Sequence, residues 1–187
     1  MASAMNILVI LLEIPGFYRS VSDRKWKIFA YYTQISNICA LLSSAFYVML
    51  GEETFTCAFR YLSSCMLTMT FVITVFVLIP MGAGLKRMMF SGNGLFHHLL
   101  CPVLSTGSYL LLEEPVRDCR MLTVPVFVTL FYGVFMMILN GLDRYQGPYP
   151  FFRVRHQSYT ATFLWTAALM IIILILSLGI MVCSALI

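Results

Sequence analysis

The feature that most limits the fold of this 187-residue chain is how seldom a charged residue occurs along it. Only 11% of the residues are charged and 60% are hydrophobic, whereas a soluble domain has about a quarter charged residues. The charge-poor stretches reach the roughly 17–25 residues that a helix needs to cross a bilayer. We therefore expect an all-α integral membrane protein, a six-transmembrane-helix bundle that forms a single domain over residues 1–187. The expected spans are about 2–18, 28–50, 61–85, 95–112, 121–142 and 158–187. The first span has no basic residues ahead of its apolar run, so we expect a retained helix rather than a signal peptide.

The basic residues are distributed unevenly among the expected loops. The first, third and fifth loops hold Arg19, Arg24, Lys25, Lys27, Lys86, Arg87, Arg144, Arg153 and Arg155, whereas the second and fourth hold Arg60, Arg117 and Arg120. Because loops rich in Lys and Arg stay in the cytoplasm, we expect both termini on the outer side of the membrane. This asymmetry accounts for the net charge of +4, and no nucleic-acid partner is needed to explain it.

Two cysteines lie in loops that are expected to share the outer side. Cys57 belongs to the second loop and Cys119 to the fourth. A disulfide between them can form in an oxidising compartment. The alternative is that the two residues share a side by coincidence.

Polar residues gather at the beginning of the second span, in the sequence YYTQISN at 31–37. Thr33 comes six residues after Lys27, which is roughly 9 Å into the helix. Small and polar residues recur there at intervals of three and four, at Ala30, Thr33, Asn37, Ala40 and Ser44. Such a stripe ordinarily packs one helix against another, with a hydroxyl such as that of Thr33 bonding back to the carbonyl of Phe29. The alternative is a functional site.

Three further polar positions are expected at a similar depth on the same side of the membrane: Glu13, the pair His97 and His98, and Asn140. Glu13 either extends to the interface or serves as a proton carrier or as a partner for a histidine. Pro102 removes the helical partner of the His98 carbonyl, so a kink is expected there. Two adjacent histidines cannot face the same way, so we expect one of them to be structural. Because polar groups inside a membrane normally face the bundle, a shared pocket that opens inward is expected.

The fifth loop contains the aromatic sequence RYQGPYPFF at 144–152. Aromatic residues are common at the membrane interface, which accounts for much of this sequence. The prolines also suit a rigid lid over a pocket.

Three of these segments, WKIFAYYTQISN, FHHLLCPVLS and GPYPFF, resemble the androgen-induced and androgen-dependent family of small multi-span proteins in their order and spacing. The resemblance is closer to the bacterial six-helix relatives of that family. Animal members are threonine hydrolases that cleave fatty acid esters of hydroxy fatty acids with an intramembrane Thr and a His. The resemblance implies Thr33 as the nucleophile and His98 or His97 as the base. Tyr149–Phe151 resembles the Tyr-Pro-Phe element of the family.

In such chemistry a histidine takes the proton of Thr33, because a threonine hydroxyl is a weak nucleophile without a base. Asn37, one turn further along the helix, is expected to donate a hydrogen bond to the developing oxyanion, a contact that can contribute roughly 3 kcal/mol. Glu13, Asn140 and Tyr149 complete the expected substrate site. The partner would be a membrane lipid or acyl ester. We expect no cofactor, and no metal, because two adjacent histidines and one distant glutamate do not have the spacing of a ligand set.

Two other classes remain as alternatives. A non-catalytic lipid-binding or membrane assembly protein would use the stripe only for packing. A small-solute transporter is less favoured, because the outer halves of the expected spans contain few polar residues. The expected location is the cell membrane if the source is bacterial, and the endoplasmic reticulum or plasma membrane if it is eukaryotic.

Overall fold

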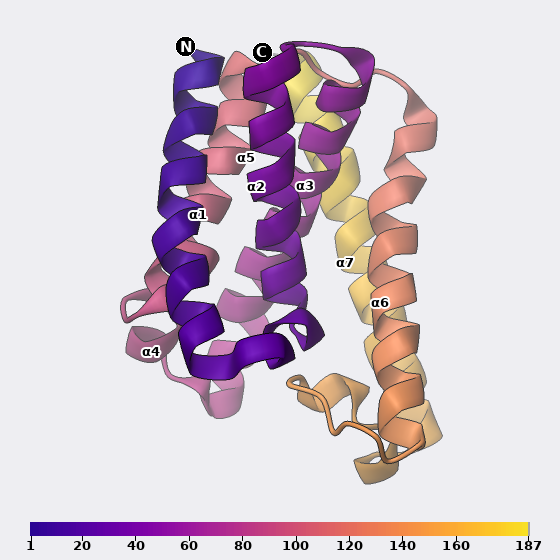
Figure 1. Ribbon diagram of the computed structural model, residues 1–187. Helices are drawn as coiled ribbons and strands as arrows, with labels where there is room; N and C mark the ends of the chain where they lie inside the picture. The colour runs from indigo at the N-terminus through magenta and orange to yellow at the C-terminus, as the bar shows by residue number, and fades with distance from the viewer. Residues whose placement is uncertain (187) are drawn as a thin grey trace.

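A computed structural model describes residues 1–186 and shows a bundle of helices (Figure 1). Six helices in this part of the chain are long and apolar enough to cross a membrane: Ala2–Asp23, Tyr32–Leu50, Thr54–Ala83, Leu95–Leu112, Cys119–Gly141 and Tyr159–Leu186. Every regular element over residues 1–186 is helical. The prediction of an all-α bundle with six candidate spans is therefore confirmed.

The long helices are continuous or are built from two adjoining segments. They are α1 (Ala2–Arg24), α2 (Tyr32–Leu50), α3 (Thr54–Ile73) continued by η2 (Thr74–Ala83), η3 (Leu95–Leu100) continued by α5 (Cys101–Leu112), η4 (Cys119–Leu122) continued by α6 (Thr123–Gly141), and α7 (Tyr159–Leu186). The connections contain η1 (Lys25–Ala30), α4 (Leu85–Met89), η5 (Pro150–Phe152) and η6 (Val154–His156).

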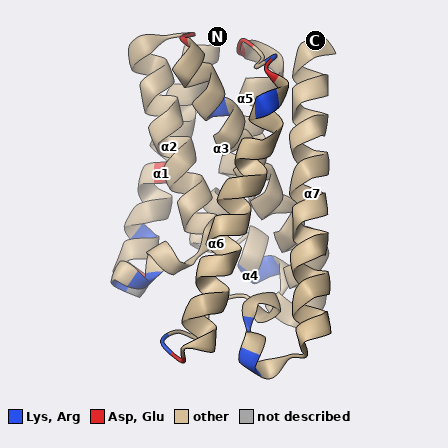
Figure 2. Cartoon of the chain, turned by 90° about the vertical axis from the view of Figure 1, so that its right-hand side faces the viewer, with Lys and Arg blue, Asp and Glu red and all other residues tan. Residues whose placement is uncertain are grey.

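Both termini lie at one end of the bundle, which we call the terminal end (Figure 1). The basic residues gather mainly at the opposite end, where η1, α4 and the connection between α6 and α7 lie (Figure 2). We call this opposite end the basic end. The charge asymmetry predicted from the loops is thus a property of the folded bundle.

The polar stripe of α2 faces the inside of the bundle. Its members on α2 are buried: Thr33, Asn37, Ala40 and Ser44. Beside the stripe, hydroxyl pairs join α2 to α3, with Ser36 Oγ 2.9 Å from Thr70 Oγ1 and Ser43 Oγ 2.8 Å from Ser63 Oγ. Small residues let helices approach closely, which is how polar interfaces are built in an apolar solvent.

Arg60 lies inside a helix and not in a loop, which corrects the prediction. The third span begins at Thr54, and the Arg60 guanidinium is fully buried. Its Nε donates to Glu113 Oε2 at 2.8 Å, its Nη2 donates to Glu113 Oε1 at 2.9 Å, and its Nη1 donates to Ser105 Oγ at 2.9 Å. Asn6 on α1 donates to the same Glu113 carboxylate at 2.9 Å. The guanidinium charge is stable inside this helix because it bonds a carboxylate and several hydroxyls. The expectation of few polar residues toward the terminal end is therefore wrong.

Two helices widen close to their prolines. The segments η2 and η3 are π-helical; Pro80 lies within η2, and Pro102 follows η3 closely. Proline lacks the amide hydrogen that a regular helix needs, and π-turns often occur at functional sites. The chain passes from η3 into α5 with helical backbone angles at Leu100 and Cys101, so the irregularity next to Pro102 is a π-helical segment. The π-helical segments carry Thr74, His97 and His98.

The expected disulfide is absent. Cys57, half-buried in the first turn of α3, and Cys119, exposed at the beginning of η4, both have free thiols. The two loop positions share the terminal end without being bonded.

Candidate functional site

A cavity of about 350 Å³ lies toward the basic end of the bundle. We call it the polar cavity. Its polar lining consists of Tyr31, Thr33, Gln34, Arg87, Asn93, His97, His98 and Tyr149. These side chains come from the beginning of α2 with the residue before it, from α4, from the connection that follows α4, from η3 and from the loop before η5, so five parts of the chain build one site. The structure thus brings together Thr33, both histidines and Tyr149, as the sequence analysis expected of a shared pocket.

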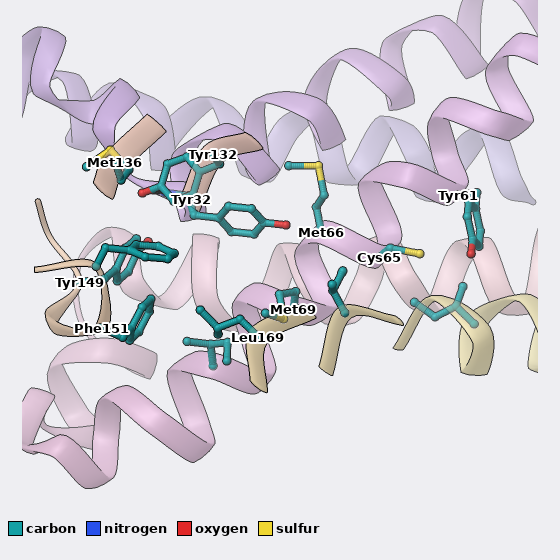
Figure 3. Packing of buried hydrophobic residues seen from close by; sticks show 14 of the residues in the cluster. Tyr32, Tyr61, Cys65, Met66, Met69, Tyr132, Met136, Tyr149, Phe151 and Leu169 are labelled. Atoms are coloured by element: carbon teal, nitrogen blue, oxygen red, sulfur yellow. Dashed lines mark hydrogen bonds between the residues drawn. The ribbon is translucent and has the colours of Figure 1, made fainter. Parts of the chain in front are cut away.

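A second hollow, which we call the apolar pocket, adjoins the polar cavity at Thr33, Tyr149 and Leu78, which line both. Its remaining lining is mostly apolar and aromatic: Tyr32, Met69, Thr70, Ile73, Thr74, Thr129, Tyr132, Phe151, Phe152 and Leu169. Figure 3 shows Tyr149 and Phe151 packed near Tyr132 and Leu169 in this region. The Tyr149 and Phe151 rings are stacked with centroids 5.3 Å apart.

Thr33 lies in the first turn of α2 and is held by Tyr149. The Tyr149 hydroxyl lies 3.3 Å from Thr33 Oγ1 and also accepts from the Thr33 backbone N–H at 3.3 Å. This amide is one of the four at a helix start that have no partner within the helix. Burial raises the pKa of Tyr149, which keeps its hydroxyl protonated and able to donate. The hydroxyl partner of Thr33 is therefore a loop tyrosine and not the carbonyl of Phe29.

His97 has a hydrogen bond at Nδ1 and a looser contact with a carboxylate at Nε2. Gln34 Nε2 lies 2.9 Å from His97 Nδ1, and Glu13 Oε2 lies 3.3 Å from His97 Nε2. Phe17 packs against the ring with centroids 4.9 Å apart. Glu13 is fully buried, so its expected extension to the interface is wrong; its carboxyl lies beside His97, and its role there stays a prediction.

His98 faces a different helix from His97. Its Nδ1 lies 2.9 Å from Thr74 Oγ1 on η2, and the ring is only partly buried. Thr74 itself lines the apolar pocket. The two adjacent histidines therefore have separate partners, as the sequence analysis expected, although both line the polar cavity.

The Asn37 side chain hydrogen-bonds backbone carbonyls. Its Nδ2 donates to the Thr33 carbonyl at 2.6 Å and to the His97 carbonyl at 3.2 Å. The first bond lies within α2 and the second joins α2 to η3, so Asn37 links the turn of Thr33 to that of His97. The oxyanion role expected of Asn37 is not supported, because its donor nitrogen already bonds two carbonyls and the side chain lines neither hollow.

Asn140 also has a structural role. Its Nδ2 donates to the Gln146 carbonyl at 3.2 Å, and its Oδ1 accepts from the Arg155 amide at 3.2 Å. These bonds fold the connection between α6 and α7, which carries Tyr149. Asn140 lines neither hollow, so its expected place in the substrate site is corrected to support of the loop.

Compared with protein-family models, with curated proteins and with solved structures, the chain matches none. Functional inference therefore depends on the geometry of the site. Among the described residues, no group of three or more His, Cys, Asp or Glu side chains is arranged to hold a metal ion.

Sequence reasoning did not assign Tyr31, Gln34, Thr74, Arg87 or Asn93 to the site. Gln34 bonds His97, Thr74 bonds His98, and Arg87 is the one Lys or Arg among the described side chains that lines the polar cavity. Gln34 belongs to the polar cluster at 31–37, and this position could have identified it as a site residue. Nothing in the sequence distinguished Thr74 from other membrane threonines.

The arrangement combines a hydroxyl, two imidazoles and a phenol at the contact between an apolar and a polar hollow. Such a site suits an amphiphile, because its chain and its polar part would each meet matching surroundings. Acyl transfer requires a nucleophile and a base within reach of each other; here Thr33 and both imidazoles line one cavity, and the Thr33 hydroxyl contacts Tyr149.

Proposed function

We propose that this chain is an intramembrane threonine hydrolase of acyl-lipid esters, related to the androgen-induced and androgen-dependent family and acting on esters like those of hydroxy fatty acids. The observation that supports this most is the position of Thr33 where the apolar pocket meets the polar cavity. The apolar pocket has a volume of only about 40 Å³, so it would have to widen to take an acyl chain, whose ester carbonyl would then lie at Thr33. The alcohol part would then lie in the polar cavity beside His98.

The proposal includes an orientation. The basic end would face the cytoplasm and both termini the outside, because loops rich in Lys and Arg are retained in the cytoplasm. The substrate would enter from the cytoplasmic leaflet. The membrane would be the cell membrane in a bacterium, and the endoplasmic reticulum or plasma membrane in a eukaryote.

The first step would form an acyl-enzyme. Thr33 Oγ1 attacks the ester carbonyl while its proton passes to His98 Nε2, and Thr74 steadies the ring through Nδ1. Substrate would first displace the Tyr149 hydroxyl from Thr33 Oγ1, because catalytic contacts are often incomplete before substrate binds. The displaced hydroxyl, still beside Thr33, would donate to the oxyanion. The tetrahedral intermediate then collapses, and the leaving alkoxide takes the proton from His98.

The second step would restore the enzyme. Water from the polar cavity attacks the acyl group on Thr33, and His98 accepts a proton from that water. Collapse of the intermediate returns the proton to Thr33 Oγ1 and releases the fatty acid. His97, held by Glu13 and Gln34, would act as a positioning residue.

A non-catalytic lipid-binding protein is the second candidate. The observation that favours it is the engagement of both nitrogens of His97 by Gln34 and Glu13, together with the bond from His98 to Thr74. Rings held in this way would line a binding cavity without taking a proton from Thr33.

Labelling of the purified chain with an acyl-mimicking fluorophosphonate probe tests the proposal. We expect the wild type and Thr33→Ser to be labelled, Thr33→Ala to be unlabelled, and His98→Gln to be labelled at least about 100-fold more slowly, in keeping with the loss of a general base. Thr68→Ala is the matched control, because Thr68 bonds Ser64 and Thr106 and lies outside the polar cavity.

Labelling that persists in Thr33→Ala contradicts the nucleophile assignment. A folded wild type that is never labelled but binds a fatty acid, with weaker binding in Thr33→Ala than in Thr68→Ala, would favour the lipid-binding candidate.

A further inference from the structure

Glu13 and His97 form a buried pair behind one wall of the polar cavity. His97 Nε2 lies 3.3 Å from Glu13 Oε2, and the two side chains are 1% and 0% exposed. The His97 ring lines the cavity, whereas Glu13 lies beyond it on α1. The carboxyl group can therefore exchange a proton with the cavity only through the imidazole or by an opening of the helices.

The surrounding residues keep the ring against the carboxyl group. Gly16 lies so close to the ring that a Cβ at this position would collide with Nε2 and Cδ2 of His97. Phe17 covers one side of the ring, and Gln34 bonds its other nitrogen. The close contact of His97 and Glu13 is thus determined by the packing of α1, α2 and η3.

The charge of this pair is not balanced by a basic residue. Among the side chains that the structure describes, no Lys or Arg forms an ion pair with Glu13. A lone carboxylate among apolar helices is costly, because little water or opposite charge stabilises it. One proton added to the pair removes the net charge, whether it resides on the carboxyl or on the ring.

Gln34 can accommodate that proton without moving away. In the observed orientation its Nε2 donates to His97 Nδ1, while its buried Oε1 accepts no hydrogen bond from the described residues. The two ends of an amide have nearly the same shape and are assigned from their hydrogen bonds. A reversed Gln34 would present Oε1 to a protonated Nδ1–H, so each protonation state of the ring has a matching amide orientation.

We propose that Glu13 and His97 act together as one site that binds a single exchangeable proton on the wall of the polar cavity. Uptake forms one N–H or O–H bond with a proton delivered by water in the cavity, and changes the net charge of the pair from −1 to zero. The inference does not depend on ester hydrolysis, since it applies equally to a cavity that only binds lipid.

The other elements packed around the pair contribute few ionisable groups. Cys101 on α5 brings its thiol to the Glu13 carboxyl. From α2 the pair meets neutral amides, Gln34 at the ring and Asn37 at the His97 carbonyl. Two basic residues lie in this part of the bundle: Arg87 lines the polar cavity together with His97, and the Arg19 guanidinium lies 5.6 Å from the ring centre of Phe96, next to His97 in the chain.

NMR of the full-length chain in lipid nanodiscs tests the proposal. In a His98→Gln, His156→Gln background, the ring ¹⁵N signals belong to His97 alone, because the chain has three histidines. We expect the ring ¹⁵N and the δ-¹³C signal of Glu13 to change around a common pH, as coupled groups do. Glu13→Gln should lower the proton affinity of the His97 ring at least tenfold, and Glu114→Gln, at an exposed glutamate, should leave it unchanged.

Two results would overturn the proposal. One is a ring that titrates identically in Glu13→Gln and Glu114→Gln. The other is a Glu13 carboxyl that titrates independently of the His97 ring while both are present. The second measurement retains Glu13, so it decides the matter even if Glu13→Gln does not fold.

Discussion

Tyr149 is the side chain through which the connection between α6 and α7 reaches Thr33. Replacing it by Phe keeps the ring and removes the hydroxyl that contacts Thr33 N and Oγ1. Under the hydrolase proposal we expect kcat for an acyl ester to fall about 100-fold or more, since one oxyanion donor contributes that much. Stability should fall by only about 1 kcal/mol, as is usual for one hydrogen bond. Ester turnover and thermal unfolding measure the two effects.

Tyr132→Phe is the matched control for this prediction. The Tyr132 hydroxyl bonds the Tyr32 amide and the Ala30 carbonyl, and neither contact involves Thr33. Equal losses of kcat in both variants would show that the Tyr149 hydroxyl has no special role at Thr33.

Gly16→Ala tests the close approach of α1 to the His97 ring. The added methyl group would overlap the ring, and such overpacking typically costs about 1–3 kcal/mol. Gly107→Ala is the control, because a Cβ there meets no atom within 4 Å. Unfolding in detergent should show a lower free energy of unfolding for Gly16→Ala only. Equal stability of the two variants would contradict the packing described.

At this scale the sequence predicted which residues gather but not how they bond. The number of residues from each helix end was enough to predict that Thr33, His97, His98 and Glu13 lie at a similar depth in the membrane, because the rise per residue of a helix is fixed. The partners depend on side-chain rotation and on how the loop folds back. This is why Asn37 and Asn140 bond the backbone instead of lining the cavity, as the sequence analysis had expected them to do.

Among the helices, the Arg60–Glu113 pair is the contact that joins α3 to the end of α5. Arg60→Met leaves a buried carboxylate without its cation, which we expect to cost about 3–5 kcal/mol. Adding Glu113→Leu to the same chain should recover part of that loss, because the stranded charge is then removed. Unfolding free energies of the two single variants and the double variant measure the coupling, and strictly additive losses would contradict it.

The boundaries of the helices show where sequence patterns succeed and fail. The span expected at 95–112 agrees with Leu95–Leu112, and the third span begins at Thr54 instead of 61. The difference arises because a charged residue such as Arg60 predicts a loop when the sequence is considered alone. In the bundle, Glu113, 53 residues away along the chain, pairs with Arg60 and neutralises its charge. A pattern within one segment carries no information about such a distant partner.

For the molecule as a whole, the proposed orientation predicts which thiols a membrane-impermeant maleimide can reach in intact cells. Cys119, exposed at the terminal end, should be labelled without permeabilisation. In a Cys57→Ser, Cys119→Ser, Cys183→Ser background, which removes the other thiols near the terminal end, Ser91→Cys, at an exposed position just after α4, should be labelled only after permeabilisation. The reverse pattern would invert the topology and put the polar cavity on the outer side.

The buried ion pair also bears on the transporter alternative. Arg60 and Glu113 line neither the polar cavity nor the apolar pocket, and their bonds are made to each other and to neighbouring helices. A polar cluster used in this way joins helices, whereas a solute path needs groups that face an opening. Because the ion pair lines neither hollow, it gives no support to a solute path through the terminal end.

The most direct measurement is the mass of the chain after brief exposure to an activated acyl ester, with the modified peptide located by fragmentation. The account predicts one acyl group, carried by Thr33, that accumulates in the wild type and is absent from Thr33→Ala. An acyl group on another residue, or one that persists in Thr33→Ala, would contradict it.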